Sequence, residues 1–124
     1  MTQAGRERRR RAQGAKADRL QESLARLDPQ LASWADGFVF DEVWGRPGLD
    51  FETRMLVAIT ALAATDRPQQ LRNYLFGGLQ AGVPQAAIQE ALVMLAVYCG
   101  FPTAIAALAV WDEVKASQRH AGGE

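Results

Sequence analysis

The stretch LRNYLFGGLQAGVP, residues 71–84, contains one side chain that can do acid–base chemistry, Tyr74. A phenol, with an ordinary pKa of about 10, is protonated at neutral pH and can donate a hydrogen bond to a developing oxyanion. Its alternative role is that of a core aromatic with a satisfied hydroxyl group. Gly77 and Gly78 follow, although each glycine inside a helix costs about 1 kcal/mol relative to alanine. The two glycines therefore indicate either close helix packing or room beside the ring.

Three charged side chains are candidates to act together with such a donor. Arg54 lies one turn into an apolar helix, and Arg46 lies in a Gly/Pro loop of the kind that presents functional groups. A guanidinium group can hold a carboxylate through two hydrogen bonds. The alternatives are a structural ion pair for Arg54 and plain solvent exposure for Arg46. Glu90, in the apolar run AIQEALVML, is expected to be partly buried and to pair with Arg54 or to orient Tyr74.

Aromatic and thiol side chains are candidates for the walls of an apolar pocket. The residues expected to contact a substrate are Phe38, Trp44, Arg46, Tyr98 and Cys99. For the aromatic residues, a core or subunit-interface position is the more common role, and for the cysteine an inert, buried position is. No cluster of His, Cys and carboxylate residues has metal-ligand spacing, so we expect neither a metal nor a cofactor. The single histidine, His120, lies near the C-terminus, away from any expected buried site.

The composition is typical of one soluble domain. The chain has 124 residues, of which 48% are hydrophobic and 23% charged. The apolar share is high for so short a chain, which indicates burial against another subunit. No apolar run reaches the length of a membrane span, and the N-terminus has no signal-peptide pattern. The one cysteine excludes an intrachain disulfide, and a reducing cytoplasm is the expected setting.

The charge is unevenly distributed, although the net charge is zero. Residues 1–20 contain seven Lys or Arg and two acidic residues, a net charge of +5. The run RERRRR is interpreted as a frayed, solvated terminus, or as a helix start that pairs with acidic neighbours in an oligomer. Contact with nucleic acid or membrane is the less favoured interpretation, because no aromatic residues are interleaved and no nucleic-acid motif follows.

Proline and glycine residues divide the chain into about six expected helices, which gives an all-α fold class. The expected helices are residues 6–27, 30–44, 51–65, 68–81, 84–99 and 102–118. Residues 1–27 form a basic arm, residues 28–118 the main domain, and residues 119–124 an expected disordered tail. Asp28 and Asp50 are expected N-caps, and Gly82 is an expected C-terminal cap.

Apolar positions predict how these helices pack. The helix over 51–65 is apolar on nearly every side, so it is expected to be the central, buried helix. The helices over 68–81 and 84–99 are expected to form an antiparallel hairpin because their connection is very short. The expected buried side of the second helix consists of Leu31, Trp34, Phe38 and Val39.

Several motifs, in order and spacing, resemble the carboxymuconolactone decarboxylase family, which shares a superfamily with the alkylhydroperoxidase D-like proteins. The motifs are VWGRPGLD, the arginine in TRML, the helix end GGLQAGVP, the glutamate in IQEAL, and VYCGFPTA. The resemblance covers roughly residues 37 to 115. It implies an all-α fold that assembles into homotrimers or homohexamers.

The resemblance also implies a type of chemistry. The decarboxylase branch removes CO₂ from a carboxylated unsaturated lactone without metal or organic cofactor, and the peroxidase branch uses a CxxC pair with a following histidine. Tyr74 occupies the position of the family histidine. Arg67 and Gln70 occupy the positions of the two peroxidase cysteines, so a thiol peroxidase is excluded.

Decarboxylation requires that the carboxylate is held and that the resulting dienolate is stabilised and protonated. We therefore expect a cofactor-free decarboxylase acting on a small carboxylated or enolisable cyclic substrate. Arg54 or Arg46 would hold the anion, and Tyr74 would act as the acid or enolate stabiliser. The alternatives are an isomerase, cyclase or dehydratase that keeps the enolate chemistry, and a non-catalytic oligomeric binder of small ligands.

Overall fold

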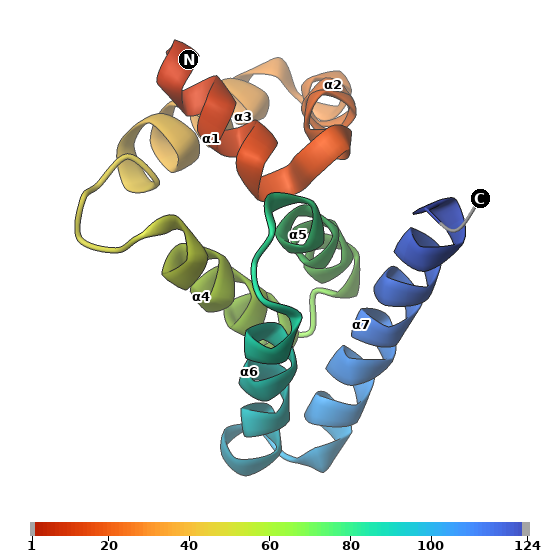
Figure 1. The fold of residues 1–124 in the computed structure, drawn as a ribbon. Coiled ribbons are helices and arrows are strands. Elements are labelled where there is room, and N and C mark those ends of the chain that lie inside the picture. The colour runs from red at the N-terminus through yellow and green to blue at the C-terminus, as the bar shows by residue number, and fades with distance from the viewer. Residues whose placement is uncertain (1, 123–124) are drawn as a thin grey trace.

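The computed structural model describes residues 2–122, with side chains described up to Arg119, and this part of the chain is all-α with no strand (Figure 1). No helix within it is long and apolar enough to cross a membrane. The elements in chain order are α1 (Gln3–Gln13), the 3-10 turn η1 (Gly14–Lys16), α2 (Ala17–Leu27), α3 (Pro29–Trp34), the π-helix η2 (Ala35–Val43), α4 (Phe51–Ala64), α5 (Pro68–Ala81), α6 (Gln85–Tyr98) and α7 (Phe101–Gly122).

The predicted helix caps are confirmed. The Asp28 carboxylate accepts a hydrogen bond from the Gln30 amide at 2.8 Å, and the Asp50 carboxylate accepts one from the Thr53 amide at 2.7 Å. Gly82 ends α5 in the left-handed conformation, with φ 83°. Each cap satisfies backbone groups that a helix end leaves unpaired, which explains why local sequence defines these boundaries.

The basic arm is not one helix, as predicted, but two helices separated at Gly14. This residue has φ 69°, a conformation that favours glycine. The side-chain carbonyl of Gln80, on α5, accepts a hydrogen bond from the Ala15 amide at 2.7 Å. The break therefore lies where the arm contacts α5.

The central helix is α5 rather than α4, which corrects the prediction from the apolar run. In Figure 1, α5 lies between the N-terminal helices and the α4, α6 and α7 group. It packs against α1, α4 and α7. On α4 only the stripe of Met55, Ile59 and Ala63 is buried, and Val57 is exposed. The apolar character of α4 on its other sides is therefore not accounted for by burial within one chain.

The expected hairpin of α5 and α6 does not form. After Gly82, Val83 and Pro84 turn the chain, and α6 packs along α7 and against α4 (Figure 1). The buried stripe of α6 is Ile88, Leu92 and Leu95. The short connection therefore reverses the chain without making α5 and α6 close neighbours along their length.

The second predicted helix, now α3 and η2, has most of its predicted buried side in solvent. Leu31, Trp34 and Phe38 are exposed, Phe38 by 61%, whereas Val39 packs partly buried against the core. The buried residues of this segment are Ala32, Asp36 and Phe40. The wider π turn of η2 changes the spacing of the inward positions, and Asp36 finds a charged partner on α1.

The C-terminal segment is also more regular than predicted. Helix α7 continues to Gly122, so residues 119–122 are helical rather than a disordered tail. Gly123 and Glu124 lie outside the described residues.

Gly77 is the point of closest approach between α1 and α5. A Cβ atom built on Gly77 would collide with the backbone carbonyl of Ala12. A Cβ atom on Gly78 would meet the ends of three side chains, the Ile88 Cδ1 atom at 3.4 Å, the Met55 Cε atom at 3.7 Å and the Ile59 Cδ1 atom at 3.8 Å. The packing explanation therefore applies to Gly77, whereas the nearest neighbours of Gly78 are core side chains and not the Tyr74 ring.

We predict that Gly77→Ala lowers the free energy of unfolding by about 1–3 kcal/mol, because the backbone of α1 must move. The matched control, Gly78→Ala, should be near neutral because the gain in helix propensity of up to about 1 kcal/mol offsets a tight side-chain contact. Urea denaturation of both variants measures the difference. Equal free energies of unfolding for the two variants would show that α1 does not pack against α5 at Gly77.

Candidate active site

The basic N-terminal helix is fixed to the fold by a buried ion pair. The Arg9 side chain is 6% exposed, and its Nη1 atom lies 2.5 Å from Oδ1 of Asp36 on η2. The second Asp36 oxygen accepts a hydrogen bond from Nε2 of Gln21 at 2.7 Å. Both carboxylate oxygens therefore have partners, which a buried charge requires to offset the loss of water.

The neighbouring arginines also find partners within the chain. Arg8 donates to the backbone carbonyl of Phe40 at 3.0 Å, and the Arg11 guanidinium lies 3.8 Å from the centroid of the Phe51 ring. The prediction of a frayed terminus is therefore wrong, because the arginines of α1 alternate around the helix and meet groups on η2 and α4.

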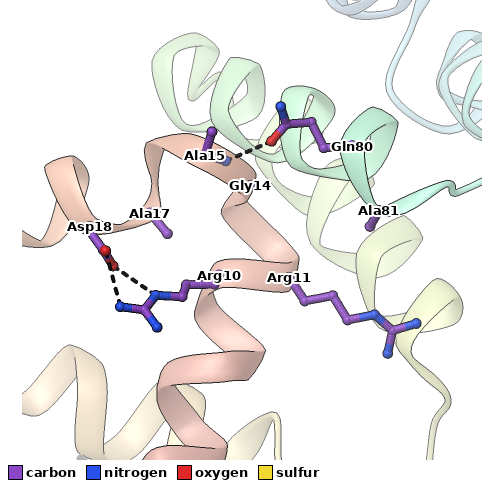
Figure 2. Close-up of a pocket in the computed structure, with 8 residues that line it drawn as sticks. All are labelled: Arg10, Arg11, Gly14, Ala15, Ala17, Asp18, Gln80 and Ala81. Carbon is purple, nitrogen blue, oxygen red and sulfur yellow. Dashed lines mark hydrogen bonds and ion pairs between the residues drawn. The ribbon is translucent and has the colours of Figure 1, made fainter.

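A pocket of about 430 Å³ lies where Arg10 and Arg11 face the end of α5 (Figure 2). Figure 2 shows the Arg10 guanidinium directed at the Asp18 carboxylate, to which it is joined by two hydrogen bonds of 3.1 Å. The Arg11 side chain extends away from this pair. Since Asp18 already neutralises Arg10, this open pocket is a weak candidate for a substrate site.

Tyr74 lies partly buried on α5. Its ring centroid is 6.3 Å from that of Trp44. Burial raises the pKa of Tyr74 above its ordinary value, and the Gln13 side chain beside the phenol partly opposes this rise. Gln13 Oε1 is buried without a hydrogen-bond partner of good geometry. The phenol is thus protonated at neutral pH, and the amide next to it has an unused acceptor.

A cavity of about 250 Å³ lies next to this pair, between α1, α2, the α3–η2 segment and α5. One wall is apolar and contains Leu20, Leu24 and Phe40. The polar lining residues are Arg9, Gln13, Gln21, Ser23, Asp36, Gln69, Gln70 and Asn73. Tyr74 is not a lining residue, but the Gln13 side chain beside its phenol is one. The cavity can accept a small polar molecule and hold it by amide hydrogen bonds.

Trp44 packs between Tyr74, the predicted hydrogen-bond donor, and two phenylalanine rings. Its ring lies 5.8 Å from Phe40 and 6.1 Å from Phe51 by centroid, in addition to its contact with Tyr74. The structure therefore brings two predicted site residues, Trp44 and Tyr74, into one aromatic cluster.

The predicted cations lie outside this cavity. Arg54 is partly buried and donates to the backbone carbonyl of Arg46 at 2.5 Å, whereas Arg46 is exposed. Neither has a carboxylate partner among the residues that the structure describes. Arg54 therefore supports the Gly/Pro loop, and the expected ion pair with Glu90 is absent from this part of the chain.

The remaining predicted residues lie on the exposed side of α6 or on the outer side of η2. Glu90 is exposed rather than partly buried, because Ile88 and Leu92 face the core and place it on the opposite side of the helix. Tyr98 is 78% exposed, and Cys99 is exposed as well. Phe38 is also exposed, so none of these four lines the cavity in a single chain.

The polar half of the cavity was missed by sequence reasoning. Arg9, Gln13, Gln21 and Asp36 come from segments that look like an ordinary charged arm and an apolar helix. One usable signal was present, because Asp36 interrupts the apolar run around it, and a buried carboxylate needs a cation. Within residues 2–119, whose side chains the structure describes, no group of His, Cys, Asp and Glu could hold a metal ion.

Comparison with known proteins identifies the family of this all-α chain. The model of the carboxymuconolactone decarboxylase family matches residues 29–113, so the chain belongs to that family. It is 33% identical over 93 residues to the 4-carboxymuconolactone decarboxylase of Acinetobacter baylyi, covering 75% of this chain and 69% of that protein. It is 35% identical over 80 residues to the nitrosuccinic acid decarboxylase of Metarhizium robertsii, covering 64% of this chain and about half, 53%, of that protein.

We predict that Tyr74 titrates above pH 10, the ordinary region for a phenol, because burial disfavours the phenolate. Because the folded-state pKa is raised, the neutral Tyr74 phenol contributes fully to the free energy of unfolding below about pH 10. This contribution is lost as the pH rises through the folded-state pKa. Ultraviolet titration of the wild type and Tyr74→Phe assigns the signal. A Tyr74 phenol that ionises at or below its ordinary pKa would contradict the buried position.

Proposed function

We propose that the protein is a cofactor-free decarboxylase of a small polar acid. Tyr74 would donate its hydrogen bond or proton to the anion that remains after CO₂ leaves. The observation that carries this proposal is the partly buried, protonated phenol of Tyr74, whose neighbour Gln13 lines a cavity with a polar lining. It occupies the position where the resemblance places the family histidine. Membership of a family with decarboxylase relatives supports the reaction class.

The two relatives' substrates share a chemical requirement that this site can meet. A carboxymuconolactone is an unsaturated lactone acid, and nitrosuccinic acid is a nitro diacid. In each compound the electrons left by CO₂ can delocalise into a carbonyl or nitro group, where an oxygen atom gains negative charge. A nearby hydrogen-bond donor lowers the energy of such an anion, and a donor in a partly dehydrated site does so more strongly than water.

The side chains of this chain have different proposed roles. Amide side chains such as Gln21 and Asn73 would hydrogen-bond the substrate's polar groups. Arg9 is engaged with Asp36, so it contributes oriented N–H groups rather than a free positive charge. Arg46, Arg54 and Glu90 lie outside this cavity, so we assign them no contact with a substrate bound there.

Enolate chemistry without CO₂ loss is the second candidate function. A phenol is a weaker acid than an imidazolium at neutral pH, and burial weakens Tyr74 further. Such a group stabilises an enolate by hydrogen bonding more readily than it delivers a proton. This favours an isomerase, cyclase or dehydratase as the alternative.

The test is turnover of carboxymuconolactone, nitrosuccinate and a β-keto acid, followed by CO₂ release and ultraviolet absorbance. Tyr74→Phe should lower kcat by a factor of about 100 or more, the usual contribution of a positioned acid. Thr65→Val, which removes a hydroxyl group at the end of α4, should leave kcat unchanged. Absence of turnover on every substrate, or full activity of Tyr74→Phe, would refute the assignment.

We also propose that the protein is a homo-oligomer, as the resemblance implies, and that α6 and the start of α7 form the contact. This surface carries several large exposed apolar side chains, namely Val93, Met94, Val97, Tyr98, Phe101 and Ile105. So many exposed apolar groups on two adjoining elements are unusual for a monomer. Burial of this surface would also cover Tyr98 and Cys99, the predicted substrate contacts that a single chain leaves exposed.

Analytical ultracentrifugation should give a mass of three or six chains, and Val97→Asp should shift it towards the monomer, because a charge would be buried in the contact. Leu49→Asp, which places a charge at an exposed apolar residue of the loop before α4, is the matched control. A monomeric wild type would contradict the proposal.

A further inference from the structure

A second cavity, separate from the candidate active site, lies between η1, α5 and α7. It has a volume of about 190 Å³ and is lined by Lys16, Arg72, Phe76, Glu113, Val114 and Ser117. None of the residues predicted for catalysis or substrate binding lines it. The two cavities use different residues of α5, because Arg72 and Phe76 face this one and Asn73 faces the other.

The Lys16 ammonium group has no counter-ion here. Its Nζ atom lies 4.6 Å from the centroid of the Phe76 ring, and no carboxylate within residues 2–119 lies at ion-pair distance from it. Its charged neighbours are Arg19 and Arg72, both of which repel it. Burial and these two cations lower the pKa of Lys16, so the ammonium form is less favourable here than in water.

The cavity therefore has an excess of positive charge. Arg72 pairs with Glu113 through Nη2 and Oε2 at 2.8 Å, so the one lining carboxylate is already used. Lys16 and Arg19 are left without a neutralising group in the same region. A ligand with a negative charge would remove the repulsion between Lys16 and Arg72, and the Ser117 hydroxyl group could donate a further hydrogen bond.

We propose that this cavity, the Lys16 site, binds a small anion through a carboxylate or phosphate group. Its volume of about 190 Å³ suits a small ligand. Phe76 and Val114 provide an apolar wall against which the body of a small organic acid can lie. The site does not depend on the decarboxylase assignment, because none of its residues belongs to the candidate active site.

The test is calorimetric titration of the full chain at low ionic strength with inorganic phosphate and, separately, with benzoate. Loss of the hydrogen-bonded cation in Lys16→Gln should weaken binding by a factor of about ten or more. Lys16→Arg should retain binding. Lys115→Gln should also bind as the wild type does, because Lys115 stacks on Trp111 in the same manner, at 5.0 Å, but lies outside this cavity.

Binding of either anion with this dependence on Lys16 supports the site, and the preferred anion identifies the phosphate or the carboxylate as its ligand. Absence of binding by both anions, or equal affinity of wild type and Lys16→Gln, overturns the proposal. If Lys16→Gln does not fold, nuclear magnetic resonance measures the pKa of Lys16 in the wild type with and without the anion. A bound anion must raise its pKa, and an unchanged pKa at saturating phosphate and benzoate overturns the site.

Discussion

The contact between α1 and α5 is the constraint on which the candidate active site depends. Gly77 lets the backbone of α1 approach α5 at Ala12, and the Arg9–Asp36 pair fixes the same helix to η2. With α1 in this position, Gln13 lies against the Tyr74 phenol and closes one side of the cavity. Without α1, Tyr74 would lose much of the burial that raises its pKa.

The buried ion pair is better understood as a positioning device than as a source of stability. Transfer of two charges from water costs nearly as much as their attraction returns, although removal of only one partner typically costs about 3–5 kcal/mol. Arg9, Gln13 and Gln21 all precede residue 29, where the family match begins. Part of the cavity is therefore built by a segment outside the matched region.

Local signals in the sequence predicted the all-α fold and most helix boundaries, because caps at Asp28, Asp50 and Gly82 act over a few residues. Which side of each helix faces the core was harder to predict. Phe38 was placed in the core and is exposed, since the π turn of η2 changes which positions face inward. Asp36 and its partner are separated by 27 residues, and no local pattern defines such a pair. Tyr74 and Trp44 lie in one aromatic cluster, whereas their predicted roles in a site stay predictions.

The most direct test of this account is amide hydrogen exchange of α1, Gln3–Gln13, in the intact protein. If α1 is held against α5 and η2, its central amides must exchange slowly, with protection close to that of α5, because they open only with the core. Exchange of these amides at the rate of a free terminus would contradict the account, since the arm would then be detached and could not form the cavity beside Tyr74.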